Sequence, residues 1–132
     1  MRATLAIVGV GLIGGSVALA WRAADPSLHV VGIDLNAPNV EEALRLGVID
    51  EIGAGYSSVA GATVVLVAVP VRRMREVFSG IAPYLKADAL IIDAGSTKSD
   101  VVAAARESLG VATARFVPCH PIAGRERSGV TA

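Results

Sequence analysis

The sequence is poor in three kinds of residue, and each shortage excludes a class of protein. One of its 132 residues is cysteine, so neither an internal disulfide nor a zinc site built on several thiolates can form. Aromatic residues make up only 4%, too few for a set of platforms that stack nucleic-acid bases. Basic and acidic residues number 12 each, so no positive surplus attracts a polyanion. The composition predicts no nucleic-acid partner, no metal, and a reducing compartment such as the cytoplasm.

Aliphatic residues and glycine dominate what remains. Hydrophobic residues make up 53% of the chain, and its length fits one domain. Apolar runs that predict strands cover 5–10, 28–35, 48–52, 62–70, 87–95 and 114–121, and runs that predict helices cover 11–24, 37–47, 71–85 and 99–110. Strands that alternate with helices predict an α/β fold of the Rossmann type: a doubly wound, mainly parallel sheet with helices on both faces.

The N-terminal segment resembles a membrane or signal segment at first sight. Residues 3–21 carry no charge. Their four glycines, at positions 9, 11, 14 and 15, are many for such a segment and are spaced in a pattern. A strand, a tight turn and a buried helix explain both the apolarity and the spacing, so we predict no membrane association.

The glycine pattern after the first predicted strand carries the first functional signal. Gly9, Gly11 and Gly14 match G-x-G-x-x-G between a strand and a helix, with Leu12 and Ile13 between the last two glycines. The first glycine allows a tight turn, the second lets a pyrophosphate approach the backbone, and the third lets the helix pack closely on the strand. The start of the helix then offers N–H groups to the phosphates. This pattern predicts a dinucleotide site.

An acidic residue occupies the position that recognises the adenosine ribose in such sites. Asp34 ends the second predicted strand, 20 residues after Gly14. A carboxylate there accepts hydrogen bonds from the ribose hydroxyls and repels a 2′-phosphate. No Lys or Arg follows until Arg45, so the sequence predicts NAD rather than NADP. The alternative is that the glycines serve only a turn and Asp34 caps a loop.

Other polar residues fall at the carboxyl ends of further predicted strands. Ligands of open parallel sheets bind at that edge. Val69 and Pro70 end the strand over 62–70 and are expected to border the cofactor. Ser96 follows the next strand, where it could cap a helix, and capping would not exclude a ligand contact. His120 follows the last predicted strand, where it either meets a substrate or hydrogen-bonds to a loop.

Three motifs, in this order along the chain, resemble the prephenate and arogenate dehydrogenases of tyrosine biosynthesis. They are GVGLIGGS at 9–16, DAGSTK at 93–98 and HPIAGRERSGV at 120–130. The resemblance implies an enzyme that uses NAD(P) to oxidise a cyclohexadienol, with loss of a carboxylate. It also implies that His120 is catalytic and contacts the ring hydroxyl, that Ser96 lies beside that hydroxyl and the nicotinamide, and that Glu126 lies near the pocket mouth.

The resemblance also implies a second domain, because members of this family are roughly twice as long. That domain is helical, forms a homodimer and supplies basic residues for the substrate carboxylates. We therefore expect residues 1–132 to be the NAD-binding domain alone, and the sequence does not choose between prephenate and arogenate. Two alternatives remain: another dehydrogenase of small substrates, of the 3-hydroxyacid or imine-reductase type, and an NAD-sensing module without chemistry. His120 favours an enzyme, since a sensor needs no histidine beside the nicotinamide.

Overall fold

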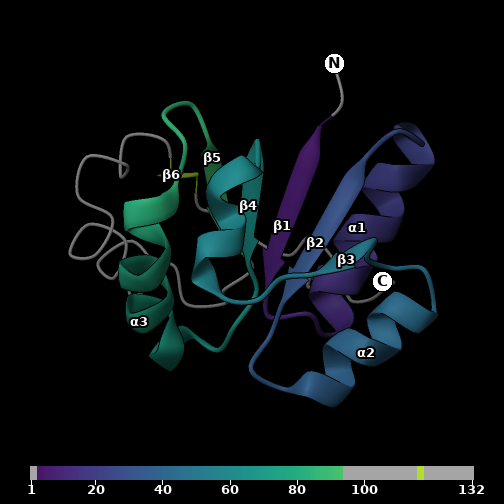
Figure 1. Ribbon diagram of the computed structural model, residues 1–132, viewed down its shortest axis with the longest axis horizontal. Coiled ribbons are helices and arrows are strands. Elements are labelled where there is room, and N and C mark those ends of the chain that lie inside the picture. The colour runs from purple at the N-terminus through teal and green to yellow at the C-terminus, as the bar shows by residue number, and fades with distance from the viewer. Residues whose placement is uncertain (1–2, 94–115, 118–132) are drawn as a thin grey trace, which may run out of the picture.

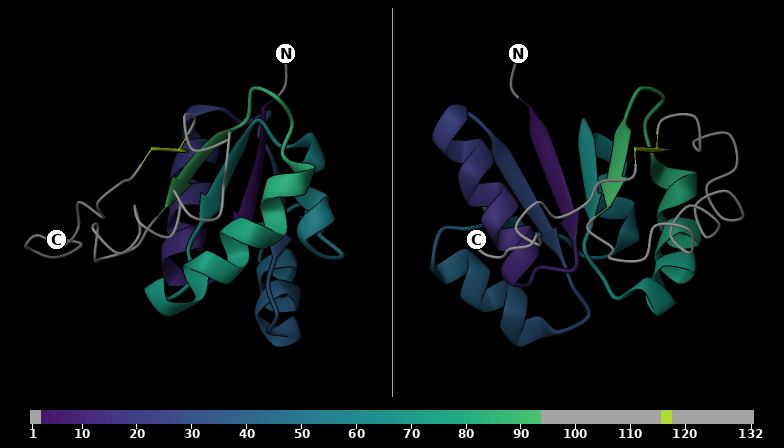
Figure 2. Two further views of the ribbon diagram at one scale, coloured as in Figure 1. Left: turned by 90° about the vertical axis from the view of Figure 1, so that its left-hand side faces the viewer. Right: turned by 180° about the vertical axis from the view of Figure 1, so that it is seen from behind.

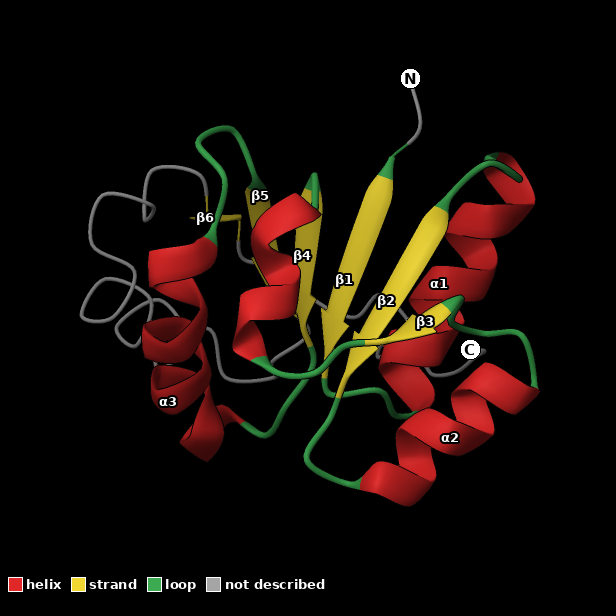
Figure 3. Cartoon of the chain, in the orientation of Figure 1, coloured by secondary structure: helices red, strands yellow, loops and turns green. Residues whose placement is uncertain are grey.

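The computed structural model describes residues 3–93 and 116–117, and their strands form one parallel sheet. The strand order in this part of the chain is β3-β2-β1-β4-β5-β6 (Figure 1). The strands are β1 (Thr4–Val8), β2 (His29–Ile33), β3 (Glu51–Ile52), β4 (Val64–Val67), β5 (Leu90–Asp93) and β6 (Phe116–Val117). All their recorded pairings are parallel, so their carboxyl ends share one edge (Figure 3). The predicted Rossmann-type sheet is confirmed.

Helices cover both faces of this sheet, as predicted. The helices α1 (Leu12–Ala24) and α2 (Ala37–Arg45) pack on one face, and α3 (Val71–Ile81) packs on the other with the 3₁₀ helix η1 (Tyr56–Gly61). Figure 2 shows α1 and α3 on opposite sides of the strands. A sheet covered in this way needs strands that are apolar on both faces, which explains the continuous aliphatic runs of the sequence.

The alternation along β1 divides the interior into two cores. Leu5 and Ile7 pack with α1 and α2, whereas Ala6 and Val8 pack with α3 and η1. All four residues are buried, with at most 3% of their surface exposed. Successive side chains of a strand point to opposite faces, so β1 is the wall between the two cores.

The helix α3 follows the hydrophobic period of its sequence. Met74, Val77, Phe78 and Ile81, which recur at helical spacing, face the sheet and are each 0% or 1% exposed. This burial fixes the rotation of α3 about its axis. The polar residues between these positions therefore point away from the core, and those near its start lie at the carboxyl edge of the sheet.

The predicted and observed elements differ mainly at their ends. The strand predicted over 62–70 is four residues long, Val64–Val67. The helix predicted over 71–85 ends at Ile81 and continues as the 3₁₀ helix η2 (Ala82–Tyr84). Residues 57–62, for which the sequence indicated no element, belong largely to η1. The helix predicted over 99–110 lies outside the described residues.

The uncharged N-terminal segment forms β1, a glycine turn and most of α1. Within residues 3–93 and 116–117, no helix combines the length and the apolarity that a bilayer span needs.

Candidate nucleotide-binding site

The turn after β1 requires a glycine at its first position. Gly9 has a φ of +94°, a conformation that residues with a side chain rarely adopt. A Cβ at Gly9 would lie 2.6 Å from the carbonyl oxygen of Ala68. Its N–H donates to the carbonyl of Ile33 at 2.8 Å, which ties the turn to the end of β2. Gly9 is therefore required by the fold itself.

The other two glycines of the motif, Gly14 and Gly11, have different structural roles. A Cβ at Gly14 would lie 2.9 Å from Cγ2 of Ile7, so Gly14 allows α1 to pack closely on β1. Gly11 has an extended backbone, with φ −125° and ψ −155°, and a Cβ there would meet nothing within 4 Å. Neither backbone strain nor internal packing demands a glycine at position 11. A glycine there leaves the backbone open to a group that approaches from outside.

The start of α1 is suited to bind such a group if it is an anion. Gly11 is the N-cap and has no side chain to accept hydrogen bonds from the first turn, which also contains no acidic residue. The first N–H groups of a helix have no partner within the helix, and the helix dipole adds positive potential there. Phosphate groups bind at helix starts for this reason. Leu12 and Ile13 supply backbone N–H groups at this place.

Asp34 links the glycine turn to the end of β2. Its Oδ2 accepts a hydrogen bond from the N–H of Val10 at 2.9 Å, and its Oδ1 accepts one from the N–H of Asn36 at 2.9 Å. Asn36 in turn caps α2, accepting from the N–H of Asn39. A carboxylate offers about four lone-pair sites. Both oxygens of Asp34 therefore keep capacity for two hydroxyl donors such as those of a ribose.

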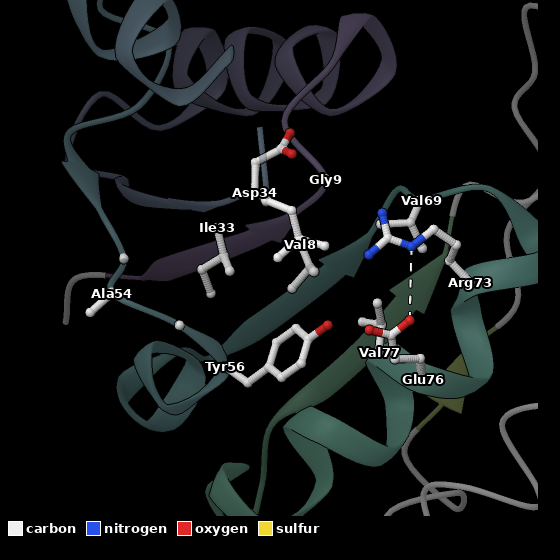
Figure 4. Close-up of a pocket in the computed structure, with 13 residues that line it drawn as sticks. Val8, Gly9, Ile33, Asp34, Ala54, Tyr56, Val69, Arg73, Glu76 and Val77 are labelled. Carbon is white, nitrogen blue, oxygen red and sulfur yellow. Dashed lines mark ion pairs between the residues drawn. The ribbon is translucent and has the colours of Figure 1, made fainter. Parts of the chain in front are cut away.

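A cavity of about 250 Å³ lies beside these residues at the carboxyl edge of the sheet (Figure 4). Gly9, Asp34 and Val69 all line it, so the structure brings together three residues that the sequence singled out. Pro70 instead precedes α3 as its N-cap. The cavity is somewhat smaller than the ~300–1,000 Å³ of typical small-molecule sites, which suits one part of a longer ligand.

Sequence reasoning missed three polar residues of this cavity. Tyr56 reaches it from η1, and Arg73 and Glu76 reach it from α3 (Figure 4). Arg73 corrects the interpretation that no base lies near Asp34, because that interpretation considered only neighbours along the chain. A signal was present: α3 begins where β4 ends, so its first turn belongs to the edge where ligands bind.

The polar residues of the cavity interact with one another. Nε of Arg73 lies 3.9 Å from Oε1 of Glu76. Burial raises the pKa of the Tyr56 hydroxyl above its ordinary value, the charge of Glu76 raises this pKa further, and the charge of Arg73 opposes the shift. Tyr56 is therefore a neutral phenol at physiological pH. Its ring packs on Gly80, where a Cβ would overlap the ring.

Three predicted site residues, Ser96, His120 and Glu126, lie outside the described residues, and their roles stay predictions. The described chain reaches the same edge at Asp93, which ends β5 and is 1% exposed. Among the described residues, no cluster of three or more His, Cys, Asp or Glu side chains could hold a metal ion.

The strand order reverses between β1 and β4, and the glycine turn and Asp34 meet beside that switch point. This arrangement defines a nucleotide-binding domain of the Rossmann type. Over residues 17–132 the sequence matches the family described as prephenate dehydrogenase, nucleotide-binding domain, and the chain belongs to this family.

Individual relatives agree with this assignment. The chain is 39% identical to the prephenate dehydrogenase of Bacillus subtilis over 134 residues, which cover 100% of this chain and 36% of that protein. It is 40% identical to the cyclohexadienyl dehydrogenase of Zymomonas mobilis over 129 residues, 95% of this chain and 42% of that protein. The crystal structure of prephenate dehydrogenase from A. aeolicus in complex with hydroxyphenyl propionate and NAD+ is similar with a TM-score of 0.83 and 37% identity, covering 98% of this chain and 45% of that one. The chain thus spans less than half the length of these relatives.

Proposed function

We propose that this chain is the NAD-binding domain of an enzyme that oxidises prephenate or arogenate with loss of a carboxylate. The observation that carries the proposal is the open approach at Gly11, above the uncapped start of α1 and beside Asp34. A pyrophosphate at α1 would place the adjoining ribose at Asp34. Family membership and the NAD+ complex of the A. aeolicus relative support the choice of cofactor.

The chemistry is assigned to residues of the later motifs. Bound NAD would supply the acceptor for a hydride from the substrate alcohol. The neutral imidazole of His120 accepts a hydrogen bond from the ring hydroxyl and takes its proton as the alcohol is oxidised. Ser96 binds the same hydroxyl and orients it, and Glu126 borders the mouth of the pocket. The support for these roles is the match of the motifs to the family.

The partners follow from the same proposal. The substrate is a small molecule, and a C-terminal helical domain would bind its carboxylates and form a homodimer. The single cysteine of the sequence favours work in the reducing cytoplasm. Family membership favours a prephenate or arogenate dehydrogenase over a 3-hydroxyacid dehydrogenase, an imine reductase or a sensor. A screen of these substrates with the dehydrogenase that contains this chain would separate the alternatives.

Binding without turnover is the first expected result. The 132-residue chain contains the turn, the helix start and Asp34, so it should bind NAD in a calorimetric titration. It should form no measurable NADH from prephenate or arogenate, because a domain that holds the substrate carboxylates is needed as well. Absence of NAD binding would contradict the proposed function, and rapid NADH formation by this chain alone would contradict the role of a second domain.

Cofactor choice depends on Asp34. We expect NAD to bind at least about tenfold more tightly than NADP, because a 2′-phosphate would face the carboxylate, and like charges in contact cost several kcal/mol. Asp34→Asn removes the negative charge and should reduce the difference in affinity between NAD and NADP, mainly by weakening NAD binding. Asp88→Asn, an exposed aspartate before β5 at the opposite edge, is the matched control and should change neither affinity. Equal or tighter binding of NADP by the unmodified chain would refute this assignment.

A further inference from the structure

The cavity beyond Asp34 has a polar wall that the proposed function does not use. Tyr56, Arg73 and Glu76 form this wall, and Figure 4 shows the Tyr56 hydroxyl pointing from η1 toward the two side chains on α3. Within the described part of the chain, the Tyr56 hydroxyl makes no hydrogen bond. The Glu76 side chain is 62% exposed, and its carboxylate lies 3.9 Å from the Arg73 guanidinium. These groups are therefore able to bind a ligand.

The order of groups in a dinucleotide decides which part reaches this wall. If the pyrophosphate lies at the start of α1 and the ribose at Asp34, the next group is the base. This step rests on the proposed function. Asp34 lines the same cavity as the three polar residues, so the base would enter the space between the apolar side chains of Val8, Ile33 and Val77. A flat aromatic ring suits this apolar space.

The charges at the wall indicate which base fits. Two carboxylates, Asp34 and Glu76, and one guanidinium, Arg73, line the cavity. An anionic group between two carboxylates is disfavoured, whereas a neutral ring that carries an amino group is not. The carboxylate of Glu76 can only accept hydrogen bonds. The Tyr56 phenol stays protonated at physiological pH and has a hydrogen to donate.

We propose that Tyr56 and Glu76 recognise the base of the dinucleotide as adenine. Glu76 accepts a hydrogen bond from the exocyclic amine, and Tyr56 donates one to the adjacent ring nitrogen. The Arg73 guanidinium, 3.9 Å from the Glu76 carboxylate, lines the cavity beside this pair. Adenine presents a donor and an acceptor side by side on this edge, and hypoxanthine presents the reverse: a carbonyl in place of the amine and an N–H in place of the ring nitrogen.

The test compares NAD with nicotinamide hypoxanthine dinucleotide in calorimetric titrations of this chain. A hydrogen bond to a charged group changes affinity by about 10- to 100-fold, and we expect the hypoxanthine analogue to bind more weakly by this factor. The amide of Glu76→Gln can both donate and accept hydrogen bonds. The ratio of the affinities for NAD and for the hypoxanthine analogue should therefore fall below about threefold. Tyr56→Phe keeps the ring against Gly80 and should weaken the binding of NAD more than the binding of the analogue.

The matched control is Glu41→Gln, which changes an exposed carboxylate on α2 that does not line the cavity. This variant should keep the full preference for NAD. Equal affinities of the unmodified chain for the two dinucleotides would overturn the proposal, as would an unchanged ratio in Glu76→Gln. In both cases NAD still binds and the proposed function stands. Failure of both dinucleotides to bind would overturn the dinucleotide site itself and this proposal with it.

Discussion

Replacing His120, the proposed general base, by asparagine in the proposed dehydrogenase should lower kcat by about 10²- to 10⁴-fold, the range that a general base contributes. Asparagine retains hydrogen-bonding capacity but cannot take the hydroxyl proton. The affinity for NAD should change little, because Gly11 and Asp34, which we propose to bind NAD, belong to other segments of the chain. Steady-state kinetics and calorimetry on the same preparation would measure both effects.

The pH dependence makes this prediction specific. An unperturbed histidine has a pKa of about 6.5, and only its neutral form can accept a proton. The rate of the unmodified enzyme should therefore fall as the pH drops through this range, and His120→Asn should lose that acidic limb. His29→Asn is the control: His29 starts β2 at the opposite edge, where its Nε2 lies 2.8 Å from Oε1 of Glu51. A near-normal kcat with an unchanged acidic limb in His120→Asn would show that this histidine only packs.

The second large effect is expected from Gly9→Ala, which should lower the free energy of unfolding by about 3 kcal/mol. Strain of a non-glycine residue at positive φ costs about 1–3 kcal/mol, and overpacking adds a similar amount. The Cβ would lie 2.6 Å from the carbonyl oxygen of Ala68, a backbone atom that cannot move freely. Urea unfolding followed by circular dichroism would measure the loss.

Gly11→Ala should behave in the opposite way. Its Cβ enters open space, so stability should fall by less than about 1 kcal/mol, the typical cost at an N-cap. NAD affinity should fall by about tenfold or more, because the added methyl group would occupy the proposed path of the pyrophosphate to the backbone. Gly61→Ala, also into open space but at the end of η1, is the control for an added methyl. Normal NAD binding by Gly11→Ala, or normal stability of Gly9→Ala, would contradict these two roles.

The positions of Gly9 and Asp34 in the site could be predicted because their spacing along the sequence follows from the path of the backbone. A turn with positive φ needs glycine, and a strand of nearly fixed length brings an acidic residue to the same edge. The faces of α3 were predictable for a similar reason, since burial of Met74 and Phe78 follows the helical period. In both cases the local pattern and the global fold demand the same residues.

The end of β4 was not predictable from its β-branched run. The run continues through Val69, but the ladder does not, because β1 ends at Val8 and Gly9 turns the chain away. The last bond to β1 runs from the N–H of Ala68 to the carbonyl of Val8. A strand ends where its partner ends, and this property of the pair is absent from either sequence alone.

The polar wall of the cavity was missed because its members come from different elements. Tyr56 belongs to a segment without a clear period, and Arg73 and Glu76 resemble solvent-facing positions of an amphipathic helix. These residues line one cavity only because the chain runs from η1 through β4 into α3. Hydrophobic periodicity identifies which residues lie outside the core. It does not show which of these residues lie close together around a cavity.

The two hydrogen bonds of Asp34 have a consequence for attempts to change the cofactor. The carboxylate that would hold the ribose also fastens Val10 in the glycine turn and Asn36 at the start of α2. Removing this carboxylate to admit a 2′-phosphate would also remove the hydrogen bond that fixes the turn proposed to bind the pyrophosphate. A useful redesign for NADP would therefore first rebuild this junction with another acceptor for the Val10 N–H, and only then add a cation for the phosphate. One side chain, Asp34, is thus expected both to select the coenzyme and to fix the glycine turn. A variant changed at position 34 alone should therefore bind both NAD and NADP weakly.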